Sequence, residues 1–291
     1  MVLGAAQLGM AYGIAGRSIA PDQSECDAIL SAAWDVGVRS IDTASSYGNS
    51  ERRIGTFLKT REDCQFEIIS KLHATVNPID RESVLASVEK SRENFGRDLD
   101  FVLLHKPAQM ETWNEGLELA LEECSRREWV RGFGVSIYTP QEFELALMIP
   151  NLQVVQLPLN VFDQRWIAGD LLARARGAEK TIFIRSVFLQ GLLLMESHDV
   201  EAKHTAASKW IEKWHRTCLE LGREPSDLAL SFVRTVAPEA QLILGCDSAE
   251  QVRRNAETFR FPLLTSAELA RLREFSSVPP EVYDPRTWSQ R

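Results

Sequence analysis

The sequence predicts a single-domain α/β protein, a (β/α)8 TIM barrel. Two observations support this fold: short apolar runs alternate with longer amphipathic stretches along the chain, and no glycine-rich nucleotide fingerprint follows the first run. The 291 residues suit either one barrel of about 250 residues or two smaller domains. Since no Gly/Ser linker or low-complexity tract divides the chain, we expect one domain over residues 1–291.

Eight apolar runs are the candidate strands. Each run is short, rich in aliphatic or β-branched residues and nearly continuous in hydrophobicity, as expected of parallel strands buried on both faces. In chain order they are VLGAAQLG from Val2, VRSIDTA from Val38, FEIISKL from Phe66, LDFVLLH from Leu99, VRGFGVS from Val130, LQVVQLP from Leu152, TIFIRSV from Thr181 and AQLILG from Ala240.

Helical patterns fill the intervals between these runs. Thr139 stands before Pro-Gln-Glu, which predicts a capping box at one helix start. An open doubly wound sheet is the alternative fold, but GAAQLGMAYG does not match GxGxxG, and GxxxxGK[ST] does not occur. The expected helices span residues 22–36, 49–59, 81–94, 111–127, 139–148, 165–175, 203–221 and 248–258, with additional ones over 226–236 and 266–275.

Composition excludes several classes of protein. Hydrophobic residues make up 44% and charged residues 25%, as in soluble globular proteins. A net charge of −8 disfavours general binding to nucleic acid or anionic membranes. The five cysteines are irregularly spaced without a CxxC pair, which indicates neither a zinc site nor a disulfide framework. With no signal-peptide pattern and no apolar run near the roughly 18 residues of a membrane span, we expect a cytoplasmic protein.

Four polar residues follow or end the second, third and fourth predicted strands: Asp42, Tyr47, Lys71 and His105. The carboxyl ends of barrel strands meet at one mouth, so these side chains are expected close together. Taken singly, the aspartate, tyrosine and histidine each have ordinary structural explanations. An ammonium group that ends an apolar strand, however, needs a partner. The coincidence of all four at corresponding strand ends favours a catalytic site.

These residues lie in segments that resemble the aldo-keto reductase family. The matching segments, in family order over nearly the whole chain, are IDTASSYGNSE, IISKLH, FVLLHKP, GFGVS, VVQLPLN, IRSVFLQGLLL and LILGCDSAEQVRRN. The resemblance implies an NAD(P)(H)-dependent oxidoreductase that reduces a small aldehyde or ketone, or oxidises the alcohol, with the four residues as its tetrad. Their chemistry agrees: Tyr47 protonates the carbonyl oxygen, Lys71 lowers the pKa of that phenol, Asp42 holds Lys71, and His105 orients the carbonyl. This chemistry needs no metal.

The same resemblance implies a cofactor site. Its residues are Ser136 and Gln156 at the nicotinamide carboxamide, Arg185 where many members stack an aromatic ring, Ser186, Phe188, Gln190 and Gly191 at the pyrophosphate, and Gly245, Cys246, Asp247, Ser248, Gln251 and Asn255 at the adenosine. The last stretch is also open to a plain structural interpretation, a helix capped by Ser248 with Gln251 three residues later.

The adenosine stretch departs from the family pattern. Gly245 and Gln251 stand where many members carry Lys and Arg for a 2′-phosphate, and Asp247 adds a carboxylate suited to the ribose diol of NAD(H). Arg253 or Arg254 compensates if either faces the pocket. We expect NADP(H), the usual family cofactor, with NAD(H) as the alternative.

Two other functions stay open at this point. One is an NAD-preferring dehydrogenase of sugar-like alcohols or hemiacetals. The other is a regulatory protein that binds the cofactor with little turnover, although such a protein does not need Tyr47 and Lys71 together. Residues in the loops after the fourth and sixth strands are candidate walls of a substrate pocket: Trp113, Gln164, Arg165 and Trp166.

Overall fold

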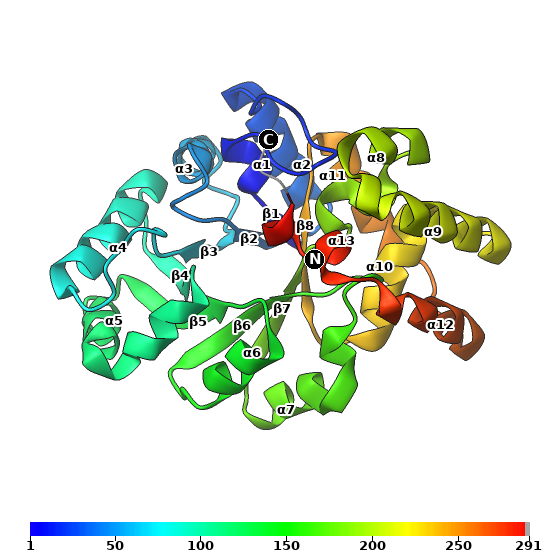
Figure 1. The fold of residues 1–291 in the computed structure, drawn as a ribbon. Helices are drawn as coiled ribbons and strands as arrows, with labels where there is room; N and C mark the ends of the chain where they lie inside the picture. The colour runs from blue at the N-terminus through cyan, green and yellow to red at the C-terminus, as the bar shows by residue number, and fades with distance from the viewer. Residues whose placement is uncertain (289–291) are drawn as a thin grey trace.

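A computed structural model describes residues 1–288 and contains eight parallel strands that close into a barrel in chain order (Figure 1). Leu3 pairs with Ile41 on one side and with Leu244 on the other, which closes the ring. Each predicted apolar run contains one strand, so the predicted (β/α)8 fold is confirmed. The strands are β1 (Val2–Gly4), β2 (Ser40–Asp42), β3 (Glu67–Lys71), β4 (Leu99–Leu104), β5 (Val130–Ser136), β6 (Leu152–Pro158), β7 (Thr181–Arg185) and β8 (Gln241–Gly245).

Helices surround the barrel (Figure 1). The α-helices are α1 (Ala6–Gly9), α2 (Gln23–Asp35), α3 (Ser50–Thr60), α4 (Arg81–Phe95), α5 (Leu117–Arg126), α6 (Pro140–Leu147), α7 (Leu171–Gly177), α8 (Ser197–Lys203), α9 (Ser208–Leu221), α10 (Pro225–Val236), α11 (Ala249–Thr258), α12 (Ser266–Arg273) and α13 (Pro280–Tyr283). Short 3-10 helices are η1 (Pro107–Glu115), η2 (Arg165–Asp170), η3 (Leu189–Leu194), η4 (Thr205–Ala207), η5 (Glu274–Ser277) and η6 (Pro285–Thr287).

Local differences from the predicted elements have simple causes. The first apolar run ends as a strand at Gly4 and winds into the short helix α1. The predicted helix over 111–127 is divided at Gly116, whose φ of 127° is incompatible with a helix, so its first half is the 3-10 helix η1. The capping box at Thr139 is confirmed: its hydroxyl accepts the backbone N–H of Glu142.

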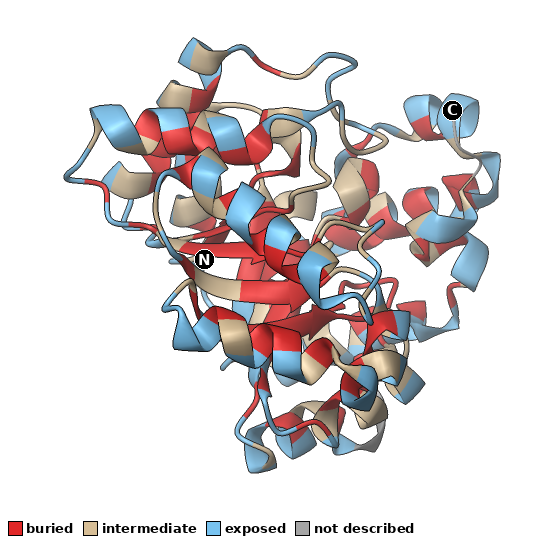
Figure 2. Cartoon of the chain, turned by 90° about the vertical axis from the view of Figure 1, so that its left-hand side faces the viewer, coloured by how far each residue is buried: buried red, intermediate tan, exposed pale blue. Residues whose placement is uncertain are grey.

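Apolar side chains form two packed layers. Val2, Ile69, Leu103, Val154, Phe183 and Ile243 fill the barrel interior. Alternate strand residues such as Leu3, Ile68 and Val155 belong to the larger core shared with the helices. Figure 2 shows the resulting pattern, with buried strands inside and helices exposed on their outer sides. Because the interior is filled, polar side chains at the strand ends gather at the barrel mouth instead.

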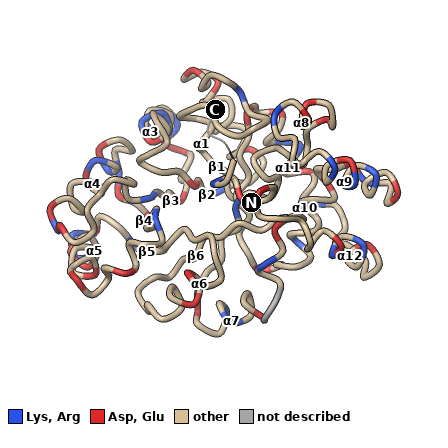
Figure 3. The backbone as a smooth tube through the Cα atoms, in the orientation of Figure 1, with Lys and Arg blue, Asp and Glu red and all other residues tan. Residues whose placement is uncertain are grey.

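The outer surface carries both signs of charge. Basic and acidic positions are intermixed along helices such as α5 and α9 (Figure 3), and Glu123 on α5 pairs with both Arg126 and Arg127. All five cysteines are buried and free of disulfides. In the described part of the chain, no helix has the length and apolar character needed to cross a membrane.

Candidate active site

A cavity of ≈ 680 Å³ opens at the carboxyl ends of the strands. Residues at the ends of β1, β2, β6, β7 and β8 and in the loops after β1, β2, β7 and β8 form its wall, together with the end of α9 and the start of α10. This volume lies within the range of about 300–1,000 Å³ that is typical of cofactor and small-molecule sites. The same barrel face carries the residues expected to be catalytic.

Lys71 and Asp42 form an ion pair beneath the cavity. The Lys71 Nζ lies 2.8 Å from each carboxylate oxygen of Asp42 and 2.8 Å from the carbonyl oxygen of Thr43. Their side chains are only 1% and 7% exposed. Gln156 donates its Nε2–H to Asp42 Oδ1 at 2.7 Å, and Ser136 donates to Gln156 at 3.2 Å. These hydrogen bonds satisfy the groups that burial would otherwise leave without partners.

The loop that carries Tyr47 is held by close backbone packing. A β-carbon at Gly9 would lie 1.8 Å from the carbonyl oxygen of Tyr47, so only glycine allows α1 to approach this loop. The backbone N–H of Tyr47 donates to Ala44 at 3.0 Å, and the Ser45 hydroxyl donates to the carbonyl oxygen of Lys71 at 2.9 Å. Tyr47 therefore projects from a rigid turn.

The structure brings all four expected tetrad residues together. The Lys71 Nζ lies 5.3 Å from the centroid of the Tyr47 ring. The rings of Tyr47 and His105 meet edge to face, with centroids 5.8 Å apart and an interplanar angle of 89°. Burial, aided by the positive charges of Lys71 and Arg185, lowers the pKa of His105 to about 4, so its ring is neutral at pH 7. Its Nδ1 is buried and has no hydrogen-bond partner among residues 1–288.

The sequence predicted that Lys71 lowers the pKa of Tyr47, but the structure indicates a different balance of effects on this phenol. Burial, followed by the nearby carboxylate of Asp42, raises the pKa of Tyr47 well above its ordinary value. Lys71 contacts both oxygens of Asp42, so its positive charge is offset by that carboxylate and does not lower the pKa of the phenol. The cation that does lower the pKa of Tyr47 is Arg185.

Arg185 is held by an arginine–tyrosine–arginine stack at the end of β7. Its guanidinium lies 4.3 Å from the centroid of the Tyr138 ring and donates to the carbonyl oxygen of Ile137 at 3.0 Å. The guanidinium of Arg286 lies 4.1 Å from the same centroid, so both cations contact one aromatic ring. Arg286 is also paired with both oxygens of Asp284. Sequence reasoning missed this stack, because nothing in the sequence places the C-terminal segment at the mouth.

The loop after β7 has an unusual backbone. Ser186, Leu189 and Gln190 have φ values of 60°, 50° and 54°, and Gly191 has φ 91°. Left-handed residues of this kind are sparse and cluster at ligand-binding loops. A β-carbon at Gly191 would lie 2.6 Å from the β-carbon of Ala15, so the loop packs against the segment after β1. Small residues and exposed backbone at this wall fit the pyrophosphate of a dinucleotide.

The loop after β8 forms the outer end of the cavity. A β-carbon at Gly245 would lie 2.1 Å from the Nε2 of Gln7, so the Gln7 amide fills the space beside this glycine. Ser248 caps α11 by accepting the N–H of Gln251 at 3.2 Å, and the Oε1 of Gln251 accepts the N–H of Asp247 at 2.8 Å. The structural interpretation of Ser248 as a helix cap is therefore confirmed.

The structure places most of the expected cofactor residues on the cavity wall. Those that line it are Gln156, Arg185, Ser186, Phe188, Gln190, Gly191, Gly245, Asp247, Gln251 and Asn255. Ser136 lies behind Gln156, the buried thiol of Cys246 accepts a hydrogen bond from Asn255 at 3.3 Å, and Ser248 does not line the cavity. Sequence reasoning missed Gln7 and Tyr12 as lining residues, although their place after the first strand was an available signal.

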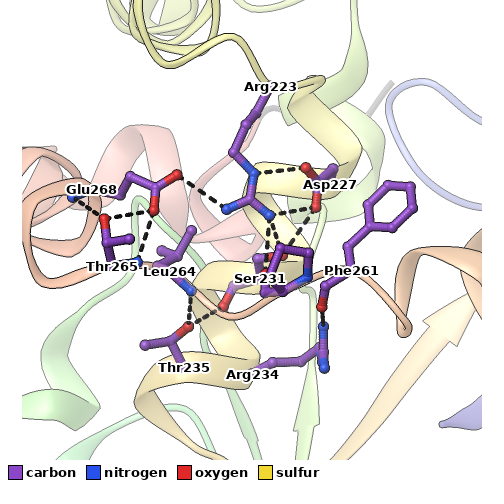
Figure 4. A network of polar contacts seen from close by, with 10 residues as sticks. Arg223, Asp227, Ser231, Arg234, Thr235, Phe261, Leu264, Thr265 and Glu268 are labelled. Atoms are coloured by element: carbon purple, nitrogen blue, oxygen red, sulfur yellow. Dashed lines mark hydrogen bonds and ion pairs between the residues drawn. The ribbon is translucent and has the colours of Figure 1, made fainter.

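Two arginines at the outer end differ in availability. Arg254 lines the cavity, whereas Arg253 is not among the lining residues, and Arg254 makes only an exposed pair with Glu250 at 3.0 Å. Arg223 also lines the cavity, but its guanidinium bonds Asp227 at 2.7 and 2.8 Å and Glu268 at 3.3 Å (Figure 4). The charge of Arg223 is therefore already balanced within the fold.

The four candidate wall residues in the other loops do not line this cavity. Trp166 is fully buried against Phe143, with ring centroids 6.2 Å apart. Gln164 donates to the carbonyl oxygens of Val161 and Leu272, each at 2.8 Å, and Arg165 pairs with Asp163. Trp113 lines a separate cavity of ≈ 390 Å³ beside α5. Trp166, Gln164 and Arg165 therefore make contacts within the fold, which loop position alone does not reveal. In the described part of the chain, no three His, Cys, Asp or Glu side chains form a metal site.

A (β/α)8 barrel with these four polar residues gathered at its mouth beside a large cavity is the arrangement expected of a nicotinamide-dependent oxidoreductase. The sequence model of the Aldo/keto reductase family matches residues 1–277, and the chain belongs to that family. It is an oxidoreductase that transfers a hydride between NAD(P)(H) and a small carbonyl compound or the matching alcohol.

Individual relatives are distant. D-threo-aldose 1-dehydrogenase from Pseudomonas sp is 25% identical, with 93% of this chain and 92% of the relative aligned. Protein REDOX 2 from Catharanthus roseus is 30% identical over 60% of this chain and 59% of its own. Among solved structures, aldo-keto reductase AKR11C1 from Bacillus halodurans (holo form) superposes with TM-score 0.76 and 18% identity, covering 99% of this chain and 94% of that one. At this identity the structural likeness shows the fold alone.

Proposed function

We propose that Tyr47 is the proton donor and acceptor of this oxidoreductase, with Asp42, Lys71 and His105 as the groups that support it. The observation that supports this most directly is the buried Lys71–Asp42 pair, which lies 5.3 Å from the Tyr47 ring as measured from Nζ to the centroid. A strongly desolvated ion pair is costly to maintain, and packing alone does not require one. We also propose that residues 1–291 act as one domain in the cytoplasm.

The bound cofactor supplies or accepts the hydride, and the protein handles the proton. In the reductive direction, Tyr47 donates its O–H to the carbonyl oxygen as negative charge develops there. Its raised pKa keeps the phenol protonated at neutral pH, as this direction requires. His105 is neutral and has an unbonded ring nitrogen, so it can hydrogen-bond the substrate oxygen and orient it. Lys71 and Asp42 hold a fixed dipole beneath the phenol.

We propose that NADP(H) is the preferred cofactor, with Arg254 as the partner of its 2′-phosphate. Arg254 lines the cavity, and its exposed pair with Glu250 contributes only about 0–1 kcal/mol, so it can exchange partners. Arg223 is unsuited to this role because Asp227 and Glu268 already hold it. Asp247 also lines the cavity and opposes a phosphate, which leaves NAD(H) as the competing cofactor.

A sugar or hemiacetal dehydrogenase is the second candidate. The name of the relative D-threo-aldose 1-dehydrogenase suggests it, and the positive charge of Arg185 near Tyr47 favours the phenolate that oxidation needs. A regulatory protein with little turnover is less well supported, since a cofactor binder has no use for the buried pair beside Tyr47.

The variant Tyr47→Phe tests the proposal, because it removes one hydroxyl and keeps the ring. We expect kcat to fall by about 10²-fold or more, the lower end of general acid contributions, with cofactor affinity nearly unchanged. Single-turnover rates with prebound reduced cofactor and a panel of aldehydes and ketones, together with reverse assays on sugars, measure the effect. Wild-type rates in this variant would remove Tyr47 from the mechanism, and an inactive wild type that binds cofactor would support the regulatory alternative.

A further inference from the structure

Two cations lie near Tyr47, and they are held differently. Lys71 contacts both oxygens of Asp42, so its charge is neutralised within the protein. Arg185 lines the cavity, and its hydrogen bond goes to the uncharged carbonyl oxygen of Ile137. Among residues 1–288, no carboxylate forms an ion pair with Arg185. The positive charge that this end of the cavity presents to a ligand is therefore that of Arg185.

The surrounding groups respond to this charge. Arg185 lowers the pKa values of Tyr47, Tyr12 and His105, three side chains that come from different loops around the mouth. The other groups that act on Tyr47 are Asp42 and Tyr138, which both raise its pKa. Burial still dominates, so the net pKa of Tyr47 remains above its ordinary value.

The stack on Tyr138 keeps Arg185 in place. Tyr138 contacts both Arg185 and Arg286, whose guanidinium groups lie 4.3 and 4.1 Å from its ring centroid. Arg286 is neutralised by Asp284, with contacts of 2.9 and 2.5 Å to its two oxygens. The outer guanidinium therefore supports the stack without adding an unbalanced charge, and the inner one is left unpaired.

We propose that the unpaired charge of Arg185 makes the bound oxidised cofactor a stronger hydride acceptor than it would be beside a neutral side chain, and so shifts this site toward oxidation of alcohols or hemiacetals. The inference rests on the proposed function, because hydride transfer requires the nicotinamide ring to lie at the Tyr47 end of the cavity. The oxidised ring carries a positive charge and the reduced ring is neutral. A nearby guanidinium disfavours the charged form, and the effect is large where water is excluded.

The direction of the reaction follows from this charge balance. Oxidation moves a hydride, a proton with two electrons, from the substrate carbon to the cofactor, and the hydroxyl proton to the Tyr47 phenolate. The substrate becomes a carbonyl compound, and the positive charge on the nicotinamide ring is lost. Arg185 favours the phenolate before the step and the neutral ring after it. Both effects favour oxidation over reduction.

Cofactor binding tests the inference independently of turnover. For each variant, dissociation constants of NADP⁺ and NADPH, and of NAD⁺ and NADH, are measured by quenching of tryptophan fluorescence. In Arg185→Gln, we expect the ratio of the oxidised to the reduced constant to fall about tenfold, which corresponds to about 30 mV for a two-electron couple. Arg185→Met is a second neutral variant should the first be unstable, and the same fall is expected.

Two control variants separate charge from shape. Arg185→Lys keeps the charge, so the ratio is expected to stay within about threefold of wild type. Arg286→Gln removes an arginine that is paired with Asp284 and does not line the cavity, so the ratio is expected to change by less than about twofold. If the ratio of the oxidised to the reduced dissociation constant stayed unchanged in both neutral variants, the inference would be overturned. If, with that ratio unchanged, KM rose for anionic substrates only, Arg185 would instead bind the substrate. Failure of the wild type to bind any nicotinamide cofactor would instead refute the proposed function.

Discussion

At the inner end of the cavity, the side chains of Lys71 and Asp42 are 1% and 7% exposed, whereas at the outer end those of Arg254 and Glu250 are 66% and 80% exposed. Both pairs have similar separations, 2.8 and 3.0 Å. Separation therefore does not distinguish them, but solvation does. Breaking a buried pair leaves an uncompensated charge in a poor solvent, while water replaces a lost partner at the surface.

This difference suits the two tasks that we propose for the cavity, proton transfer and cofactor selection. Proton transfer needs charges that do not move. The inner pair is tied to strands β2 and β3, and Lys71 also donates to the carbonyl oxygen of Thr43 while Gln156 donates to Asp42. Cofactor selection needs a charge that can change partners, and the outer pair lies on a single helix turn of α11. The predictions below test this contrast between the two ends.

Breaking the inner pair should give the largest effect. In Lys71→Met, the free energy of unfolding should fall by about 3–5 kcal/mol because Asp42 loses its buried partner. The rate should fall about 10³-fold because the charge arrangement beneath Tyr47 is lost. Urea denaturation and single-turnover kinetics measure the two quantities. Arg254→Gln is the matched control, with an expected stability change below about 1 kcal/mol. Equal effects of both variants would contradict the contrast.

The dependence of the free energy of unfolding on pH in the acid range tests the burial of His105 at the inner end. Since folding lowers the pKa of His105 from 6.5 to about 4, only the unfolded chain binds a proton between these values. Stability is therefore unaffected above pH 6.5 and is lost as pH falls toward 4, by up to about 3 kcal/mol. His105→Gln should flatten this limb in urea titrations at several pH values. His198→Gln, at a histidine with an 80% exposed side chain, should keep the wild-type slope.

At the outer end, the expected effects are on cofactor choice instead of stability. Arg254→Gln should weaken NADPH binding about tenfold and leave NADH binding nearly unchanged, because the reduced cofactors differ by one phosphate. Dissociation constants from tryptophan fluorescence measure this. Arg253→Gln removes the same charge from a neighbour that does not line the cavity, so a comparable loss there would refute a specific role for Arg254.

Removal of the opposing carboxylate should give the smallest effect. Asp247→Ser is expected to strengthen NADPH binding relative to NADH by about threefold, since like-charge repulsion with the phosphate disappears. The effect is modest because the positive charge of Arg17 acts on Asp247 and offsets part of its field. The same fluorescence titrations, with Glu250→Gln as an acidic control on α11, decide whether Asp247 acts on the cofactor. A reversed preference would mean that Asp247 holds the ribose of NADPH.

Much of the inner site was predictable because strand ends converge in any parallel barrel. Asp42, Lys71 and His105 end or follow β2, β3 and β4, so the strand pattern alone places them at one mouth. The pKa of Tyr47 was not predictable in this way. It depends on burial and on how completely Asp42 cancels Lys71, and the contact joins residues 29 positions apart.

By itself, the sequence determined the (β/α)8 barrel and the strand ends that carry Asp42, Lys71 and Arg185, since apolar periodicity and strand order are local properties of the chain. Tertiary structure alone decided which charges are neutralised and which remain available. Two examples depend on contacts between residues far apart in the chain: Arg286 packs against Tyr138, and Gln7 fills the space beside Gly245. The energy of an interaction between two charges depends on their burial and on their distance in space, and the spacing of residues along the chain determines neither of these.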